Sequence, residues 1–240
     1  MRAVERRTKK PGRPKKAKGQ MAIRIGTRFE IPKWVQDHAS FRRWARSPEC
    51  PEKLRLAFYR GTLWIDPDME QFFVHNQVKL AIALVLAPLV KSNRTGRYGT
   101  DGMPVTNPNI ELSTVPDGFY YSFDAFRSGR IRERASARNG CTEFEGVPEM
   151  VLEVVSNSSE TKDLVDLREW YWKGGIEEYW LVDARTEEVS IEILKKGEGG
   201  YISEKRAAGG WVRSNVFRKS FRLVRGDDEV GKPIYTLEVR

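Results

Sequence analysis

A single carboxylate inside an apolar strand constrains this chain most. The run from Met150 to Val155 is otherwise almost entirely apolar, as in a strand that is covered on both faces, and Glu153 stands within it. Burying an unpaired charge is so costly that such a group is usually protonated, ion-paired or bound to a metal. Glu153 therefore needs a partner, and it is the first candidate for a functional residue.

A helix and a second strand follow directly. Polar side chains at 156–159 suit a helix cap, apolar side chains then recur at helical spacing up to Gly174, and residues 178–183 again have the composition of a strand. This order is the crossover unit of a parallel or mixed sheet, in which the chemistry usually lies at the carboxyl ends of strands. The predicted fold class is α/β, a central mixed sheet flanked by helices.

A second acid lies upstream. Pro116 precedes Asp117 at the head of an aromatic-rich run typical of a strand, so Asp117 is expected at a strand end. An aspartate there and a glutamate on the next strand form an acid pair suited to Mg²⁺ or Mn²⁺. Such an ion would activate a water for phosphodiester hydrolysis and neutralise charge on the phosphate. Taken singly, a Pro-Asp is common in turns, and a strand glutamate is often ion-paired.

Three segments resemble a known family: PDGFYYS, GVPEMVLEVVSNSS and KDLVDLREWYWKGGIEEYWLVDAR. They are similar to the Uma-type family of restriction endonuclease-like proteins, a bacterial branch of the PD-(D/E)XK nuclease superfamily. The resemblance runs from Ile31 to Tyr201 and is strongest from Pro116 to Arg185. It implies a restriction-endonuclease-like fold, a divalent metal held by Asp117 and Glu153 as the catalytic acids, and action on DNA.

The chain departs from that family at a lysine. In the superfamily a lysine stands two residues after the glutamate, on the same face of the strand, and here that residue is Val155. Uma-type proteins usually carry the lysine in the next helix, four residues before the tyrosine that matches Tyr171, and here that residue is Leu167. Lys162 or Arg168 could bring a positive charge near the phosphate instead, although an always-protonated arginine is a poor base.

Two functions from different classes therefore stay open. The first is a metal-dependent DNA endonuclease with Asp117 and Glu153 as metal ligands. The second is a DNA-binding protein on a nuclease-like scaffold that has lost cleavage, which the apolar Val155 and Leu167 favour. Because a metal can activate water without a lysine, the missing lysine does not exclude the first.

The basic charge is concentrated at the N-terminus. The chain has 42 Lys and Arg against 33 Asp and Glu, a net charge of +9. Residues 1–20 hold nine of the basic residues and one acid, a net of +8, which leaves 33 against 32 in the remainder. Residues 1–20 have no apolar residue beyond Val4 that could anchor a core, so we expect a disordered basic arm over residues 1–25.

The centre of the arm, KKPGRPKK, resembles an AT-hook. Gly12 lets the backbone approach the minor groove, Pro14 keeps it extended, and Arg13 meets the negative potential of a narrow groove. Pro11 stands where the usual hook has an arginine, and the alternative is a nonspecific polybasic tail. The residues expected to contact DNA are Lys9, Lys10, Gly12, Arg13, Pro14, Lys15 and Lys16.

The rest of the chain is predicted to form one nuclease-like domain over residues 26–222 and a charged peripheral segment over residues 223–240. Residues 71–90 predict a core helix that ends at Pro88, because the apolar part is shorter than the ~20 residues of a membrane span. We interpret His75 in this helix as structural, and Asp101 as a turn residue.

Compartment and assembly follow from composition. Two cysteines and two histidines are too few for a zinc site, and a chain of this length needs no disulfide. The basic N-terminus has no apolar stretch of the signal-peptide kind. We expect a cytoplasmic protein with DNA as its partner and no membrane; association with the nucleoid and formation of a homodimer are left open.

Overall fold

The strand that carries Glu153 lies in the middle of a six-stranded mixed sheet with the order β12-β11-β10-β9-β6-β3. The computed structural model describes residues 31–50, 55–66, 71–135, 140–157 and 159–240, and residues 31–240 form one compact unit. The strands are β3 (Gly96–Thr100), β6 (Gly118–Ser122), β9 (Met150–Val154), β10 (Glu178–Asp183), β11 (Ser190–Lys196) and β12 (Tyr201–Ser203). β9 and β10 are parallel and the other neighbours are antiparallel, which confirms the predicted α/β class with a central mixed sheet.

The predicted strand, helix and strand are present around Glu153. After β9 the chain enters a π-helical turn, η3 (Lys162–Asp166), which continues into α4 (Leu167–Lys173). The helix ends at Gly174, and Gly175 follows with a φ of +87°, a left-handed conformation that a residue with a side chain rarely adopts. The chain then returns as β10, which pairs in parallel with β9.

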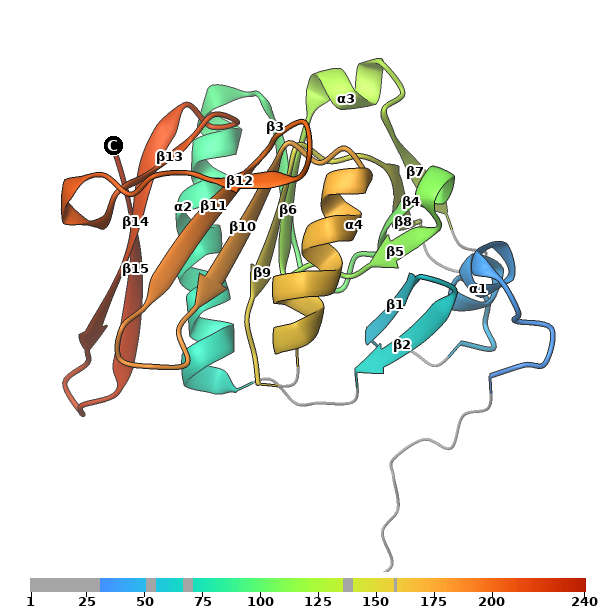
Figure 1. The fold of residues 1–240 in the computed structure, drawn as a ribbon, viewed down its shortest axis with the longest axis horizontal. Helices are drawn as coiled ribbons and strands as arrows, with labels where there is room; N and C mark the ends of the chain where they lie inside the picture. The colour runs from blue at the N-terminus through green and yellow to red at the C-terminus, as the bar shows by residue number, and fades with distance from the viewer. Residues whose placement is uncertain (1–30, 51–54, 67–70, 136–139, 158) are drawn as a thin grey trace, which may run out of the picture. The chain divides into compact units, whose positions relative to one another are not determined.

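Alternating side chains of β9 face two different cores. Val151 and Val155 belong to the core that contains Leu167 and Tyr171 of α4, whereas Leu152 faces the opposite core. Figure 1 shows α4 in front of the central sheet and α2 behind it. Because successive side chains of a strand point to opposite faces, Glu153 lies on the α4 side of the sheet.

The opposite core is covered by η1 (Phe72–Asn76) and α2 (Gln77–Asn93). This 22-residue stretch is long and apolar enough to cross a membrane by length and composition alone, but one side of it is buried in the fold. The buried side chains on that side are Val78, Ile82, Leu86 and Val90. The sequence led us to expect that the helix ends at Pro88, but α2 continues through Pro88 to Asn93. Pro88 and Leu84 are on the exposed side, where water can satisfy the carbonyl that a proline leaves without a partner.

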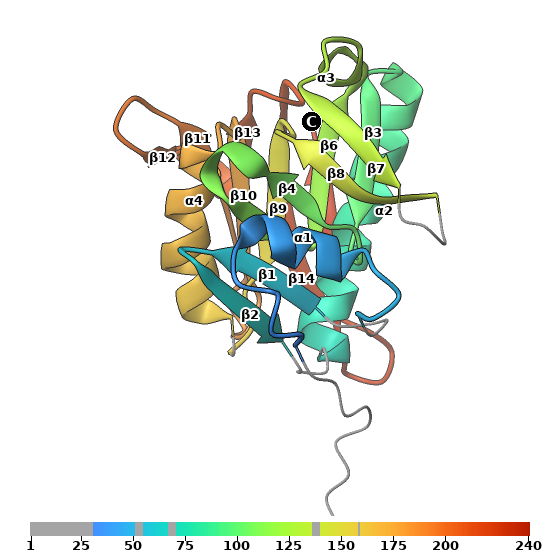
Figure 2. The ribbon, with the colours of Figure 1, turned by 90° about the vertical axis from the view of Figure 1, so that its right-hand side faces the viewer.

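A second sheet lies beside α4, over the same face of the central sheet. Its order is β2-β1-β5-β4-β8-β7, and β4 and β8 are its parallel pair. Figure 2 shows this sheet from its own side, with α1 (His38–Ala45) over β1. Its strands are β1 (Arg55–Tyr59), β2 (Thr62–Asp66), β4 (Val105–Asn107), β5 (Leu112–Thr114), β7 (Ile131–Ala135) and β8 (Cys141–Gly146). Short helices lie at η2 (Pro108–Ile110) and α3 (Phe123–Arg127).

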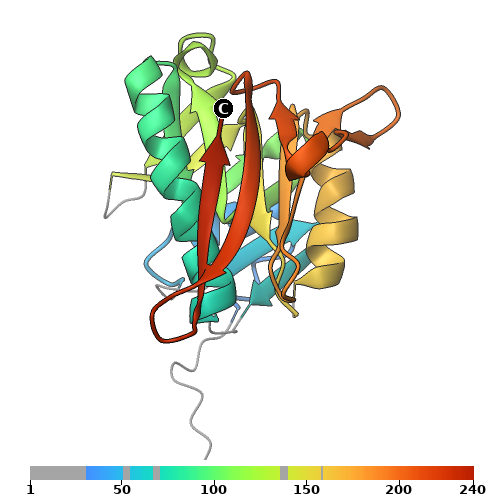
Figure 3. The same ribbon diagram turned by 90° about the vertical axis from the view of Figure 1, so that its left-hand side faces the viewer.

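The C-terminal residues form a third, antiparallel sheet next to α2 (Figure 3). Its strands are β13 (Val212–Ser214), β14 (Lys219–Asp227) and β15 (Pro233–Val239), and a short helix, η4 (Ala208–Gly210), precedes them. Leu223 and Leu237 of this sheet are buried in the α2 core. Residues 223–240 are therefore part of the folded unit and not a peripheral segment as the charged sequence suggested, because Leu223 of β14 and Leu237 of β15 are buried. The predicted arm, residues 1–25, lies outside the described residues.

Candidate metal site

The backbone positions of Asp117 and Glu153 lie opposite each other at the ends of two neighbouring strands. Gly118 pairs with Leu152 in the antiparallel register of β6 and β9, so one step further along this register places Asp117 opposite Glu153. Asp117 is 5% exposed and Glu153 is 2% exposed. Side chains that lie directly opposite in an antiparallel pair are close enough to interact. The fold thus brings the two acids to one edge of the central sheet.

Asp117 is held by side chains of η1 and α2 and by the backbone of β9. The backbone N–H of Val154 donates to Oδ2 at 2.8 Å, and Nε2 of His75 lies 3.3 Å from the same oxygen. Nζ of Lys79 lies 3.6 Å from Oδ1. Burial alone would raise the pKa of Asp117. This effect is outweighed by the hydrogen bond and charge of His75, the charge of Lys79 and the N–H of Val154, so the pKa falls to about 2. Asp117 is therefore ionised at neutral pH.

Glu153 has the opposite electrostatic balance. The hydroxyl of Tyr171 donates to Oε1 at 2.6 Å, and Oγ1 of Thr114 lies 3.1 Å from that hydroxyl. Burial raises the pKa of Glu153 well above its usual value; Lys162 opposes this shift, whereas the charges of Asp163 and Asp117 add to it. The surroundings of the two acids therefore shift their pKa values in opposite directions.

Lys162 supplies a positive charge on the α4 side of the pair. It is the first residue of η3, and its Nζ lies 3.1 Å from Oδ1 of the buried Asp163. Although burial alone would lower the pKa of Lys162, the negative charges of Glu153 and Asp163 raise it above its usual value. Lys162 therefore stays protonated next to Glu153. Arg168, the other basic residue considered from the sequence, forms no ion pair with a carboxylate in the part of the chain that the structure describes.

The two apolar residues at the family's lysine positions pack in the core. Val155 is 2% exposed and Leu167 is 1% exposed, and both belong to the core between α4 and the sheet. Leu167 thus attaches the helix to the sheet, as its apolar neighbours indicate.

The sequence did not lead us to expect Lys79 near the acids, and it led us to interpret Asp101 only as a turn residue. Lys79 is buried, lies one helical turn after His75, and pairs with both Asp101 and Asp117. A lysine within an otherwise apolar helix, four residues after a histidine, was the available signal, because residues at this spacing share one helix face. His75, interpreted as structural, points to Asp117, and Asp101 binds a lysine besides preceding the turn at Gly102.

Gly118, directly after Asp117, permits a close approach by Tyr98. A Cβ at Gly118 would lie 2.2 Å from the Tyr98 hydroxyl oxygen, which is too short for any side chain. That hydroxyl is buried, and burial, followed by the charges of Asp117 and Asp101, raises its pKa. The glycine of the Pro-Asp-Gly sequence is therefore required by packing at the site.

The donor set suits a hard divalent cation. Two carboxylates provide oxygen ligands of the kind that Mg²⁺ and Mn²⁺ bind, and a divalent charge would offset the burial and the nearby negative charges that raise the pKa of Glu153. Among the described residues there is no group of three or more His, Cys, Asp or Glu side chains that could hold an ion. The acid pair is thus the candidate, with Asp117 and Glu153 as the protein ligands.

Comparison with known proteins identifies the family. The profile of the Uma2 family, described as "Putative restriction endonuclease", matches residues 39–223. The chain belongs to the Uma2 family. Among solved structures, it is similar to a protein from Anabaena variabilis ATCC 29413 described as "a putative nuclease belonging to DUF820". The two chains are 18% identical, the match covers 68% of this chain and 83% of the other, and the TM-score is 0.52. No curated protein matches the sequence.

The match confirms the resemblance found in the sequence and the nuclease-like fold. At 18% identity the Anabaena structure supports the fold alone. The roles of individual Uma2 residues in this chain are taken up below from the geometry of its own site.

Proposed function

We propose that this Uma2 protein is a metal-dependent endodeoxyribonuclease that hydrolyses phosphodiester bonds in DNA, with Asp117 and Glu153 as ligands of Mg²⁺ or Mn²⁺. The observation that carries the proposal is the register of β6 and β9, which sets the two buried acids opposite each other. The description of the Uma2 family supports DNA as the substrate.

The side chains around the acids would hold them in place. When bound, a divalent cation supplies positive charge for the phosphate and activates a water. The Val154 N–H and His75 fix the carboxylate of Asp117 from one side, and the Tyr171 hydroxyl fixes Glu153 from the other. Ligands fixed by surrounding hydrogen bonds need little rearrangement when the cation arrives.

Lys162 takes over the charge of the missing lysine in this proposal. Its protonated ammonium lies on the side of Glu153 that faces η3, and Glu153 contributes most to keeping its pKa high. A protonated lysine there can stabilise negative charge on a phosphate oxygen, although it cannot accept a proton. The apolar Val155 and Leu167 favoured an inactive scaffold, but the partly buried Lys162 supplies a positive charge that acts on Glu153.

Plasmid nicking tests the proposal. The full-length protein should convert supercoiled DNA to the open-circular form with Mg²⁺ or Mn²⁺ and not with EDTA. Asp117→Asn and Glu153→Gln should each abolish nicking while DNA binding persists. Glu169→Gln is a matched control, because Glu169 is a carboxylate on α4 that pairs with Arg60 and Lys173 outside the site. Nicking that survives both substitutions would contradict the proposal.

A further inference from the structure

A second concave site lies between the end of α2, the end of β6 and the turn between β13 and β14. It has a volume of about 540 Å³, within the range of roughly 300–1,000 Å³ of small-molecule sites. Asp117 precedes the first residue of β6, whereas Tyr120 and Ser122 of that strand line this site. It is therefore separate from the acid pair, and its role does not depend on the proposed nuclease activity.

The floor of this site is apolar and aromatic. Leu89 and Val90 of α2 contribute aliphatic side chains. The ring of Phe217 is partly exposed, and the buried Tyr120 supports it from below, with ring centroids 5.1 Å apart and the rings tilted by 54°. A floor of this kind favours a ligand with a flat, apolar body, because apolar contact removes surface from water on both partners.

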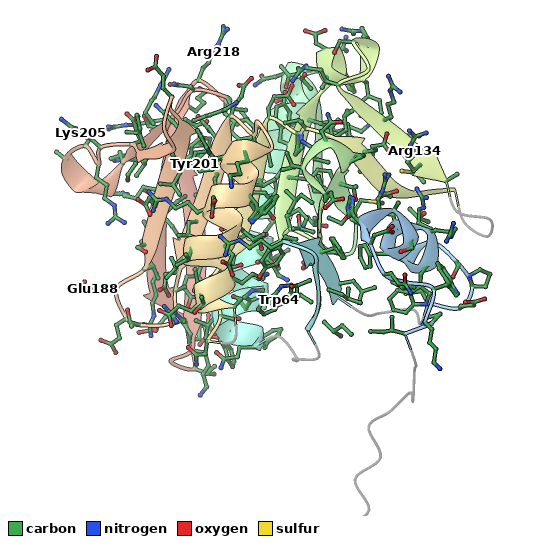
Figure 4. The ribbon with its side chains drawn as sticks, turned by 45° about the vertical axis from the view of Figure 1, so that its right-hand side comes forward. Trp64, Arg134, Glu188, Tyr201, Lys205 and Arg218 are labelled. Atoms are coloured by element: carbon green, nitrogen blue, oxygen red, sulfur yellow. The ribbon has the colours of Figure 1, made fainter. Side chains whose placement is uncertain are left out.

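The rim carries three guanidinium groups, from Arg94, Arg127 and Arg218, against the carboxylate of Asp124. Arg127 already pairs with Asp124 at 2.5 Å. Within the described part of the chain, neither Arg94 nor Arg218 forms an ion pair with a carboxylate. Figure 4 shows Arg218 at the edge of the molecule, with its side chain reaching into solvent. Two guanidinium groups are thus available to an anion at the mouth of the site.

The backbone holds these two arginines in an uncommon conformation. Arg94 has a φ of 53° and Arg218 a φ of 56°, and they are two of the four non-glycine residues with positive φ in the described ranges. Such a conformation costs about 1 kcal/mol or more for a residue with a Cβ, so glycine would relieve strain at both turns. The chain instead places an arginine at each. The C-terminal end of α2 disfavours an anion, so the guanidinium groups have to outweigh it; the backbone N–H of Arg94 already bonds the carbonyls of Val90 and Lys91.

We propose that this site binds a mononucleotide, with the base against the partly exposed ring of Phe217 and the phosphate between Arg94 and Arg218. Guanidinium groups match phosphate oxygens in geometry and charge, and aromatic floors accept any base because every base has a π-face. An aliphatic anion would use the rim but gain less from the aromatic floor.

The proposal is tested by isothermal titration of the full-length protein with dAMP, inorganic phosphate and deoxyadenosine, all in EDTA, and by a repeat of the dAMP titration with Mg²⁺ in place of EDTA. The dAMP affinity should exceed that of either fragment by about tenfold or more, since each fragment lacks one set of contacts. The double variant Arg94→Gln/Arg218→Gln should lose at least about tenfold in dAMP affinity, because charge-assisted bonds are lost at both positions. Arg213→Gln, an exposed arginine of β13 outside the site, should bind as the parent does.

Four results would overturn the proposal. These are no dAMP binding, phosphate binding as tight as dAMP binding, full affinity in the double variant, and dAMP binding that appears only with Mg²⁺. The third would assign binding to other basic residues such as the N-terminal arm, and the fourth would assign it to the acid pair. Circular dichroism of the double variant, whose substituted side chains are exposed, shows whether it is folded.

Discussion

The hydroxyl of Tyr171 donates a 2.6 Å hydrogen bond to Glu153, so α4 restrains the central carboxyl of the site. Tyr171→Phe removes this donor and leaves a buried carboxyl with fewer partners. We expect the free energy of unfolding to fall by about 1–2 kcal/mol in urea denaturation. Tyr235→Phe, at a half-buried position on β15, is the control and should change stability much less. Equal losses for both variants would show that the Glu153 bond does not stabilise the fold.

Glu153→Gln should change how stability depends on pH. Folding raises the pKa of Glu153, so the native state keeps a proton that the unfolded chain releases above about pH 4.3. The free energy of unfolding therefore falls as pH rises from that value toward the folded pKa, and glutamine removes this loss. The variant should be more stable than the parent at about pH 7 and lose that advantage below about pH 4. Urea titrations across this range measure it; a difference that does not vary with pH would contradict the raised pKa.

The pH dependence of stability that Asp117 contributes has the opposite sign to that of Glu153. Its folded pKa of about 2 is below the unfolded value, so its ionised form stabilises the protein above about pH 3.9 and that stability is lost as pH falls toward 2. Asp117→Asn should therefore flatten the acid limb of the stability curve between these values. Asp227→Asn, near the end of β14, is the comparison. An acid limb unchanged by Asp117→Asn would mean that His75 and Lys79 do not hold the ionised carboxylate.

Lys162→Met should reduce nicking strongly without removing metal binding. The substitution keeps most of the apolar stem and deletes the charge beside Glu153, so phosphate stabilisation is lost while both acids remain. We expect a decrease of about 10²-fold in single-turnover rate, the scale of losing one preorganised donor. Lys173→Met, at the other end of α4, is the matched control. Equal rates for both variants would remove Lys162 from the proposed site.

The basic arm should hold DNA independently of the fold. Deleting residues 1–20 removes a net charge of +8 and leaves a body near neutrality, so DNA affinity should fall. The slope of log affinity against log salt should flatten by roughly 0.9 per lost phosphate contact. If Arg13 enters the minor groove, Arg13→Ala should weaken binding to A·T-rich duplex more than to G·C-rich duplex, whereas Lys16→Ala should weaken both equally. Unchanged affinity and slope would place the DNA-binding surface on the folded body.

The sequence predicted the framework of the fold because its local signals agree with the tertiary structure. The apolar run around Glu153, the helix that ends at Gly174 and the strand 178–183 all occur as predicted. The C-terminal segment was misjudged, because alternation in β14 and β15 is interrupted by charged residues although Leu223 and Leu237 are buried. The charged composition of residues 223–240 was a poor guide to their burial, and the apolar residues at strand spacing were a better one.

The site was predictable in its acids and not in their surroundings. Asp117 and Glu153 stand out because a carboxylate in an apolar setting is costly. Lys79 approaches Asp117 from a helix 38 residues upstream, a distance in sequence over which periodicity carries no information. The position of Lys162 relative to Glu153 depends on the π-helical turn η3, which shifts the side chains by part of a turn and has no sequence signal of its own.

Manganese binding tests the central claim, that Asp117 and Glu153 share one divalent cation. Titration of the full-length protein with Mn²⁺, followed by the loss of the free-ion electron paramagnetic resonance signal, should show a site that Mg²⁺ displaces. Asp117→Asn and Glu153→Gln should each weaken this site by at least about tenfold, the scale for losing a charged ligand, and Glu169→Gln should leave it unchanged. Mn²⁺ affinity equal to that of the parent in both acid variants would contradict the shared site.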